Sequence, residues 1–140
     1  MLRVDRITVG IVIDHILPGQ GLKVFGRLGL RRAGYPVALL MNVTSSKIGR
    51  KDIIKISDTL DLDLTMLGLI APDATVNYIE DGAVTRKVTP GLPERVTGLI
   101  ECKNPRCITT IERQGVSVFT LVDREAKEYE CAYCGERVRV

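Results

Sequence analysis

The sequence predicts an α+β chain in which a ferredoxin-like N-terminal domain, an antiparallel sheet with two helices on one face, precedes a small all-β zinc-binding domain. Three observations lead to this fold class. Apolar residues recur with strand and helix periods in the order strand, helix, strand, strand, helix, strand. Two prolines and a glycine fall within the segment 89–94, which is typical of a linker. All four cysteines follow that segment, and we therefore expect one domain over 1–93 and a second over 94–140.

The sequence of the first half of the N-terminal domain predicts three strands and one helix. Apolar residues at every second position predict a first strand over 7–13, and the Pro- and Gly-rich segment 18–21 ends it. Apolar residues at helical spacing then predict a short amphipathic helix over 22–28. A dense apolar run over 36–43 is too short for a typical helix and favours a central strand, and 51–57 reads as the next strand.

The second half of this domain predicts a helix and a hairpin. Asp61 or Asp63 can cap a helix that continues to about Leu69, and Pro72 prevents its continuation. Asp81-Gly82 is a strong turn signal because both residues adopt positive φ readily. The two hairpin strands are expected over 74–80 and 83–88.

The second domain predicts short strands and a thin core. Phe119 and Tyr129 are its two aromatic residues before the last cysteine pair. So few large apolar side chains give a domain of this size little to bury, and a structural metal would supply the missing stability. The expected strands run over 96–101, 108–113, 116–123 and 128–131.

The cysteines form two closely spaced pairs. Cys102 and Cys107 are separated by four residues and Cys131 and Cys134 by two, with 23 residues between the pairs. Two tight turns carrying such pairs can bring four thiolates around one zinc ion with no open coordination position, which is a structural zinc site. Disulfides, a redox pair and four unliganded core cysteines are the alternatives, and the paired spacing favours zinc.

Composition and charge exclude several classes of protein. Apolar residues make up 45% and charged residues 26%, which is typical of folded globular chains and not of disordered ones. No uncharged stretch is long enough to span a bilayer and the first residues lack an apolar signal core, so we expect a cytoplasmic protein. Residues 94–140 carry equal numbers of acidic and basic side chains, which argues against a domain that binds nucleic-acid phosphates.

A second cluster of polar residues lies in the first domain. The stretch 47–55 carries four basic residues and one acidic residue, and Lys51 and Lys55 share one face of the predicted strand. These lysines can hold a phosphate-bearing ligand, or they can be the solvated edge of a sheet. Asp14-His15 at the end of the first strand can likewise contact a ribose hydroxyl or cap the strand.

Signals for catalysis are weak. The chain has one histidine, no G-x-S-x-G sequence and no Walker pattern. A small phosphate-processing enzyme that uses Arg50 and Lys51 is one alternative. A zinc-ribbon nucleic-acid-binding protein is a second, although six aromatic residues in all provide few stacking surfaces, and a zinc adaptor without a small ligand is a third.

Four blocks of sequence occur in one order with the four cysteines. The blocks are Val12-Ile13-Asp14-His15-Ile16, the segment 49–56, the segment 71–77 and Leu92-Pro93-Glu94-Arg95. Together with the cysteines they resemble the regulatory chains of aspartate carbamoyltransferase, and the resemblance covers nearly the whole chain. It implies a non-catalytic allosteric subunit in pyrimidine biosynthesis, with a domain that binds nucleoside triphosphates (CTP, ATP and UTP) and a zinc domain that docks on the catalytic chain.

The resemblance implies an effector pocket on one edge of the first domain. Asp14 would bind ribose hydroxyls, Lys55 would read the base or ribose side, and Lys87 would hold phosphates. His15 and Lys51 would lie near the phosphates or a second nucleotide, where a magnesium ion could bridge. The residues implied for the base pocket are Val4, Asp5, Ile7, Val12, Asn77, Ile79 and Val84.

The resemblance also implies the partners of the chain. These are the catalytic chain, which Asn104 would face, and a second regulatory chain bound through the N-terminal domain, but neither nucleic acid nor a membrane. Four residues depart from the family pattern. Arg6 stands where a small residue is frequent, Gly82 where an aromatic residue can cover the pocket, Arg106 in place of an asparagine and Gly135 in place of an acidic residue.

Overall fold

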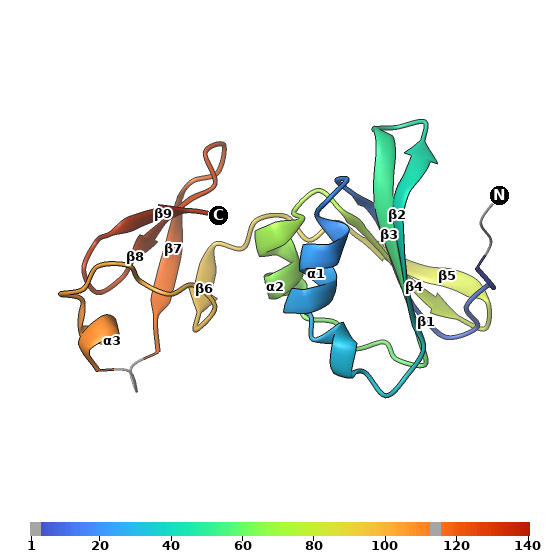
Figure 1. The fold of residues 1–140 in the computed structure, drawn as a ribbon, viewed down its shortest axis with the longest axis horizontal. Helices are drawn as coiled ribbons and strands as arrows, with labels where there is room; N and C mark the ends of the chain where they lie inside the picture. Colours follow the sequence, from blue (N-terminus) through green and yellow to red (C-terminus); the bar gives the residue numbers. More distant parts are fainter. Residues whose placement is uncertain (1–3, 113–115) are drawn as a thin grey trace. The chain divides into compact units, whose positions relative to one another are not determined.

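The computed structural model describes residues 4–112 and 116–140 and divides into two compact units (Figure 1). The first unit is Met1–Gly91 and the second is Leu92–Val140. None of the helices among the described residues is both long enough and apolar enough to cross a bilayer.

The first unit is a five-stranded sheet with two α-helices on one face. The strand order is β2-β3-β1-β4-β5, and every neighbouring pair is antiparallel. Figure 1 shows α1 and α2 side by side on one face of this sheet. The elements are β1 (Gly10–Ile16), α1 (Gly21–Arg27), the one-turn 3₁₀ helix η1 (Leu30–Arg32), β2 (Val37–Ser45), β3 (Gly49–Ser57), α2 (Leu64–Ile70), β4 (Thr75–Glu80) and β5 (Ala83–Val88). The predicted antiparallel sheet with two helices is therefore confirmed.

The core lies between the sheet and the helices. Alternate residues of the central strands are fully buried on that face, among them Ile11 and Ile13 of β1 and Ile54 and Ile56 of β3. Val24 of α1 and Leu67 of α2 are also fully buried and belong to the same cluster. The residues between them, such as Val12 and Lys55, face away from the helices. One sheet face thus makes the core, and the other carries both apolar and charged side chains, such as Val12 and Lys55.

Local signals account for the ends of several elements. Asp63 Oδ1 accepts a hydrogen bond from the Met66 amide at 3.0 Å and caps α2, which ends at Ile70 before Pro72. Asp81 and Gly82 have φ values of 53° and 75°, as a tight primed hairpin turn requires.

The first strand differs from its predicted range. Strand β1 begins at Gly10 and continues to Ile16, whereas the alternation predicts 7–13. A bulge between Ile13 and Ile16, with His15 at φ 57°, inserts one extra residue and returns Ile16 to the core face. The simple alternation ends at this bulge, so it could not predict that the strand continues.

The second unit is a four-stranded antiparallel sheet with one short helix. The strand order is β6-β7-β8-β9. Phe119 and Tyr129 are fully buried, and the Tyr129 hydroxyl donates a hydrogen bond to the Pro93 carbonyl. The elements are β6 (Arg95–Thr97), α3 (Ile108–Ile111), β7 (Val118–Asp123), β8 (Glu128–Cys131) and β9 (Arg137–Arg139).

Three features of the second unit differ from the sequence prediction. Ile108–Ile111 is a single helical turn and not the start of a strand over 108–113, and Arg113 lies outside the described residues. The strand expected over 96–101 ends at Thr97. Strand β9 was not predicted, because Arg137, Val138 and Arg139 follow the last cysteine with a single apolar residue between two charges.

Candidate functional sites

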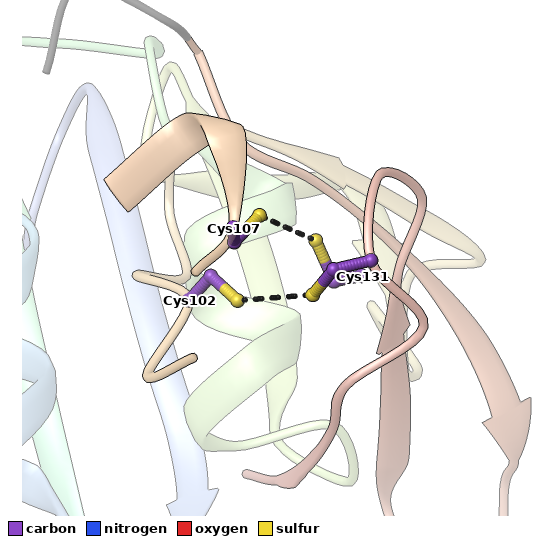
Figure 2. Close-up of side chains that lie close together, drawn as sticks. Cys102, Cys107 and Cys131 are labelled. Carbon is purple, nitrogen blue, oxygen red and sulfur yellow. Dashed lines mark hydrogen bonds between the residues drawn. The ribbon is translucent and has the colours of Figure 1, made fainter. Parts of the chain in front are cut away.

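The four cysteine sulfurs converge in the second unit. Cys102 and Cys107 come from the connection between β6 and α3, while Cys131 ends β8 and Cys134 lies in the turn before β9. All four Sγ atoms lie within 4.8 Å of one another. Sγ of Cys102 is 3.6 Å from that of Cys134, and Sγ of Cys107 is 3.8 Å from that of Cys131. Figure 2 shows the sulfurs facing one another across the space between the two loops.

These distances fit a tetrahedral metal site and not disulfides. A zinc ion bound to four thiolates at about 2.3 Å places neighbouring sulfurs about 3.8 Å apart. A disulfide would require about 2.05 Å, and all four cysteines are free. Cys102, Cys107 and Cys131 are buried, so three of the four sulfur ligands are shielded from water. The donor set and its geometry therefore match structural zinc.

Hydrogen bonds shape the two cysteine loops. In the first loop the Arg106 amide donates to Asn104 Oδ1 at 3.0 Å, and the Cys107 amide donates to the Asn104 carbonyl at 3.1 Å. In the second, the Gly135 amide donates to the Cys131 carbonyl at 2.9 Å, and Gly135 has a φ of 79°. The second pair lies between two strands as predicted, whereas the first leads into α3, with Cys107 as its N-cap residue.

The four thiols have different electrostatic surroundings. The Thr109 hydroxyl lies 3.1 Å from Cys107 Sγ, and this hydrogen bond lowers the pKa of the Cys107 thiol to about 6. Burial raises the pKa of the Cys102 thiol to about 12 and also raises the pKa of Cys131. Burial alone therefore opposes ionisation of two thiols, and a dipositive ion would supply the compensating charge.

In the first unit, four of the residues singled out in the sequence form one row across the sheet. Lys55 of β3 pairs with Val12 of β1, Val12 pairs with Asn77 of β4, and Asn77 pairs with Lys87 of β5. Paired residues of antiparallel strands project to the same face. This row lies on the face opposite the helices, because its neighbours along β1 and β3 belong to the core.

A bulge in the hairpin places Val84 on the same face as this row. Ile79 pairs with Val84, whereas Tyr78 pairs with Arg86, so Thr85 is the extra residue of β5. Without the extra residue, Val84 and Lys87 would project to opposite faces, because side chains alternate along a strand. The Thr85 hydroxyl hydrogen-bonds Glu80 Oε2 at 3.0 Å and holds the bulge.

A hollow of about 190 Å³ lies beside the row. Its lining residues are Arg6, Ile7, Val12, Lys55, Ile79 and Gly82. Four of these residues belong to the effector set that the sequence resemblance implies. Arg6 and Gly82 do not belong to that set, although both positions depart from the family pattern, and that departure is the signal that could have added them. The other implied residues, Val4, Asp5, Asp14, His15, Lys51, Asn77, Val84 and Lys87, do not line this hollow.

Asp14, His15 and Lys51 gather at the bulged end of β1. Lys51 Nζ lies 3.0 Å from Asp14 Oδ1, and the same oxygen accepts a hydrogen bond from the His15 amide at 2.7 Å. Nδ1 of His15 is buried and has no hydrogen-bond partner among the described residues. This end of the sheet therefore combines a half-buried ion pair with an unpartnered ring nitrogen.

Sequence reasoning missed the role of Asp52. Its carboxylate is fully buried and accepts hydrogen bonds from the amides of Gly19, Gly21 and Asn42 at 3.0–3.1 Å. A Cβ on Gly21 would lie 2.7 Å from Asp52 Oδ2, so glycine is required there. The carboxylate joins the turn before α1 to the bulge of β2, next to Lys51.

Comparison with known proteins identifies the family to which both units belong. Residues 2–90 match the family model for the allosteric domain of the aspartate carbamoyltransferase regulatory chain, and residues 94–140 match the model for its metal-binding domain. The chain belongs to the aspartate carbamoyltransferase regulatory chain family. It is therefore a regulatory chain and not a catalytic subunit. The sequence resemblance is confirmed over both units.

Curated regulatory chains are similar over nearly their full length. The chain is 52% identical to the aspartate carbamoyltransferase regulatory chain of Clostridium tetani, covering 100% of this chain and 98% of the relative. It is 49% identical to that of Clostridium botulinum strain Hall, covering 97% and 93%. Identity to the Bifidobacterium longum regulatory chain is 44%, with 99% and 100% covered. These regulatory chains therefore align with both units and not with one alone.

Proposed function

We propose that this regulatory chain binds nucleoside triphosphates in its domain 1–93 and transmits their effect to the catalytic chains of aspartate carbamoyltransferase through its domain 94–140. The row of Lys55, Val12, Asn77 and Lys87 on the open sheet face is the observation that carries this proposal. It offers two cations at its ends and a neutral centre. Such an arrangement suits a ligand with a planar apolar part and an anionic tail.

Each part of the site has a role in this proposal. The hollow beside Val12 and Ile79 receives the base, Lys55 contacts the base or ribose side, and Lys87 holds phosphates. Val84 and Asn77 complete the apolar and polar edges of the base pocket, together with Val4, Asp5 and Ile7. CTP, ATP and UTP are the expected effectors.

The bulged end of β1 provides a second group of contacts. Asp14 binds ribose hydroxyls, and Lys51 and His15 lie near the phosphates or a second nucleotide. The unpartnered Nδ1 of His15 supports a ligand here, because a buried polar atom without a partner is unfavourable. A magnesium ion that accompanies the phosphates would be accommodated at this end.

The zinc domain makes the contact with the catalytic chain. Zinc acts as a structural crosslink that fixes both cysteine loops, and Asn104 in the first loop faces the partner. A second regulatory chain binds through the N-terminal domain, where β2 and β5 each have one strand neighbour among the described residues and leave two sheet edges open. The assembly works in the cytoplasm.

Regulation follows from differential affinity. An effector shifts catalysis only by the difference between its affinities for two quaternary states of the complex. A nucleotide that binds both states equally leaves the activity unchanged. The regulatory chain therefore needs no catalytic group of its own.

Native mass spectrometry of the zinc-loaded chain with the aspartate carbamoyltransferase catalytic trimer from the same source tests the assembly. A complex of both chains that dissociates when a chelator removes zinc is the expected result. A folded, zinc-loaded chain that forms no complex would contradict the proposal.

Calorimetry of CTP and ATP binding tests the effector site. Lys55→Ala and Lys87→Ala should each weaken binding by about tenfold, since each removes one charge-assisted contact. Lys23→Ala is the matched control, because Lys23 is an exposed lysine of α1 on the helix side of the sheet. Equal affinities in all three variants would place the nucleotide elsewhere.

A further inference from the structure

Within the described part of the chain, two cations and no acidic side chain line the hollow on the open sheet face. Arg6 and Lys55 are its charged residues, and Ile7, Val12 and Ile79 supply its apolar part. Arginine and lysine side chains donate hydrogen bonds and accept none. The side chains around this hollow therefore favour a flat apolar ring whose edge presents acceptors.

The β4–β5 turn is hydrogen-bonded to the segment that precedes β1. The Gly82 amide donates a hydrogen bond to the Thr8 carbonyl at 2.9 Å, which ties this turn to the segment that carries Arg6. Gly82 has no side chain, and no neighbouring atom lies within 4 Å of the place where its Cβ would be. The turn thus contributes no side chain to the hollow at Gly82, and Arg6 is one of the two charged side chains that line the same hollow.

The Arg6 guanidinium is free to bind a ligand. Within residues 4–112 and 116–140 it takes part in no ion pair and no side-chain hydrogen bond. Its donors form a planar fork that matches two adjacent acceptors. O6 and N7 of a 6-oxopurine such as guanine are such a pair of acceptors. Adenine instead presents the acceptor N7 beside its 6-amino group, and this amino group is a donor that cannot accept a hydrogen bond from the guanidinium.

The geometry points to Arg6 as a specificity-determining residue that favours 6-oxopurine nucleotides, GTP and ITP, over ATP. This inference rests on the proposed function, because Arg6 can select among bases only if the hollow holds the base. ATP and ITP share the ribose, the triphosphate and the ring shape and differ at the purine 6-position and the adjacent N1. Their comparison therefore isolates the edge that Arg6 would read.

Calorimetric titration of the full zinc-loaded chain with ATP, ITP and GTP tests the inference. For the unmodified chain we expect ITP and GTP to bind about tenfold more tightly than ATP, which is the discrimination typical of one bidentate arginine contact. Arg6→Ala should weaken ITP and GTP binding by this factor and leave ATP binding nearly unchanged. Arg31→Ala is the control, since Arg31 is an exposed arginine of η1 that does not line the hollow.

Three other outcomes would overturn the inference, and they are distinguishable. If Arg6→Ala weakens all three nucleotides by one factor, Arg6 contacts the phosphates and reads no base. If the variant binds all three as the unmodified chain does, Arg6 does not touch the ligand. If the unmodified chain binds no nucleoside triphosphate, the proposed function itself fails and this inference fails with it.

Discussion

Lys51 and Asp14 form an ion pair that joins β3 to the bulged end of β1, with Lys51 Nζ 3.0 Å from Asp14 Oδ1. The side chains are 17% and 22% exposed, so solvent screens this pair less than it screens a surface pair. The pair holds together two residues that we place in the effector site.

The first prediction concerns the strength of this pair. A double-mutant cycle with Lys51→Met and Asp14→Asn should give a coupling free energy of unfolding of about 1 kcal/mol, measured by urea titration. Adding 1 M NaCl should reduce the coupling, because salt screens the attraction. Additive single-variant effects at low salt would mean that the two charges do not interact.

The second prediction concerns the buried Asp52 carboxylate. Asp52→Ala leaves the amides of Gly19, Gly21 and Asn42 without their acceptor and should lower the free energy of unfolding by about 3 kcal/mol. Urea unfolding followed by the NMR signals of β1 and β3 measures this loss. Asp73→Ala is the control, because Asp73 is exposed. Equal stability of the two variants would contradict a structural role for Asp52.

The third prediction concerns the pH dependence of zinc binding. Zinc needs four thiolates, whereas burial raises the pKa of Cys102 and Cys131, so both are protonated at pH 7 without metal. Zinc binding should therefore release protons, and zinc affinity should rise with pH. Competition with a chromophoric chelator between pH 6 and pH 9 measures this dependence.

The Thr109→Val variant tests, in the same experiment, how the Thr109 hydroxyl affects zinc affinity through the pKa of Cys107. Loss of the hydroxyl raises the Cys107 pKa from about 6 towards the value of a free thiol. Zinc affinity at pH 7 should fall by about tenfold, and the difference should disappear above the pKa of a free thiol. Thr120→Val, an exposed threonine of β7, is the control. The same affinity for both variants at pH 7 would exclude this role of Thr109.

The fourth prediction concerns Asn104 at the proposed interface. Its Oδ1 caps the cysteine loop by accepting from the Arg106 amide, and its side-chain amide donates no hydrogen bond within residues 4–112 and 116–140, so this donor is left for a partner. Asn104→Asp keeps the acceptor and removes the donor, so zinc binding should persist while affinity for the catalytic trimer falls by about tenfold. Surface plasmon resonance and zinc content separate the two effects. Loss of zinc together with affinity would assign Asn104 to the loop alone.

Local patterns predicted the elements whose signals are local. The Asp81-Gly82 turn depends on neighbouring residues and was predicted correctly, and Asp63 is the one of the two cap candidates, Asp61 and Asp63, that caps α2. The bulges at His15 and Thr85 depend on pairing with other strands, which alternation along one strand does not contain. The sequence resemblance named Val84 and Lys87 together, and the bulge explains why both project to one face.

Two other features were hidden by tertiary context. Ile108-Thr109-Thr110-Ile111 has the β-branched composition of a strand, yet the cysteine loop that ends at Cys107 directs it into a helical turn. Asp52 lies in the charged stretch 47–55, whose sequence is also typical of the solvent-exposed edge of a sheet. Its burial depends on amides of the distant turn at Gly19 and Gly21, which no pattern around Asp52 indicates.

The row from Lys55 to Lys87 also fixes the distance between the two lysine backbones. It crosses three strand-to-strand steps, each about 4.8 Å, so the backbones at its two ends are about 14 Å apart. Hydrogen bonding across the sheet fixes this span, and side-chain motion changes only the reach of each ammonium group. A ligand must be extended to engage both lysines at once, so the sheet itself would discriminate a nucleoside triphosphate from shorter anions by length.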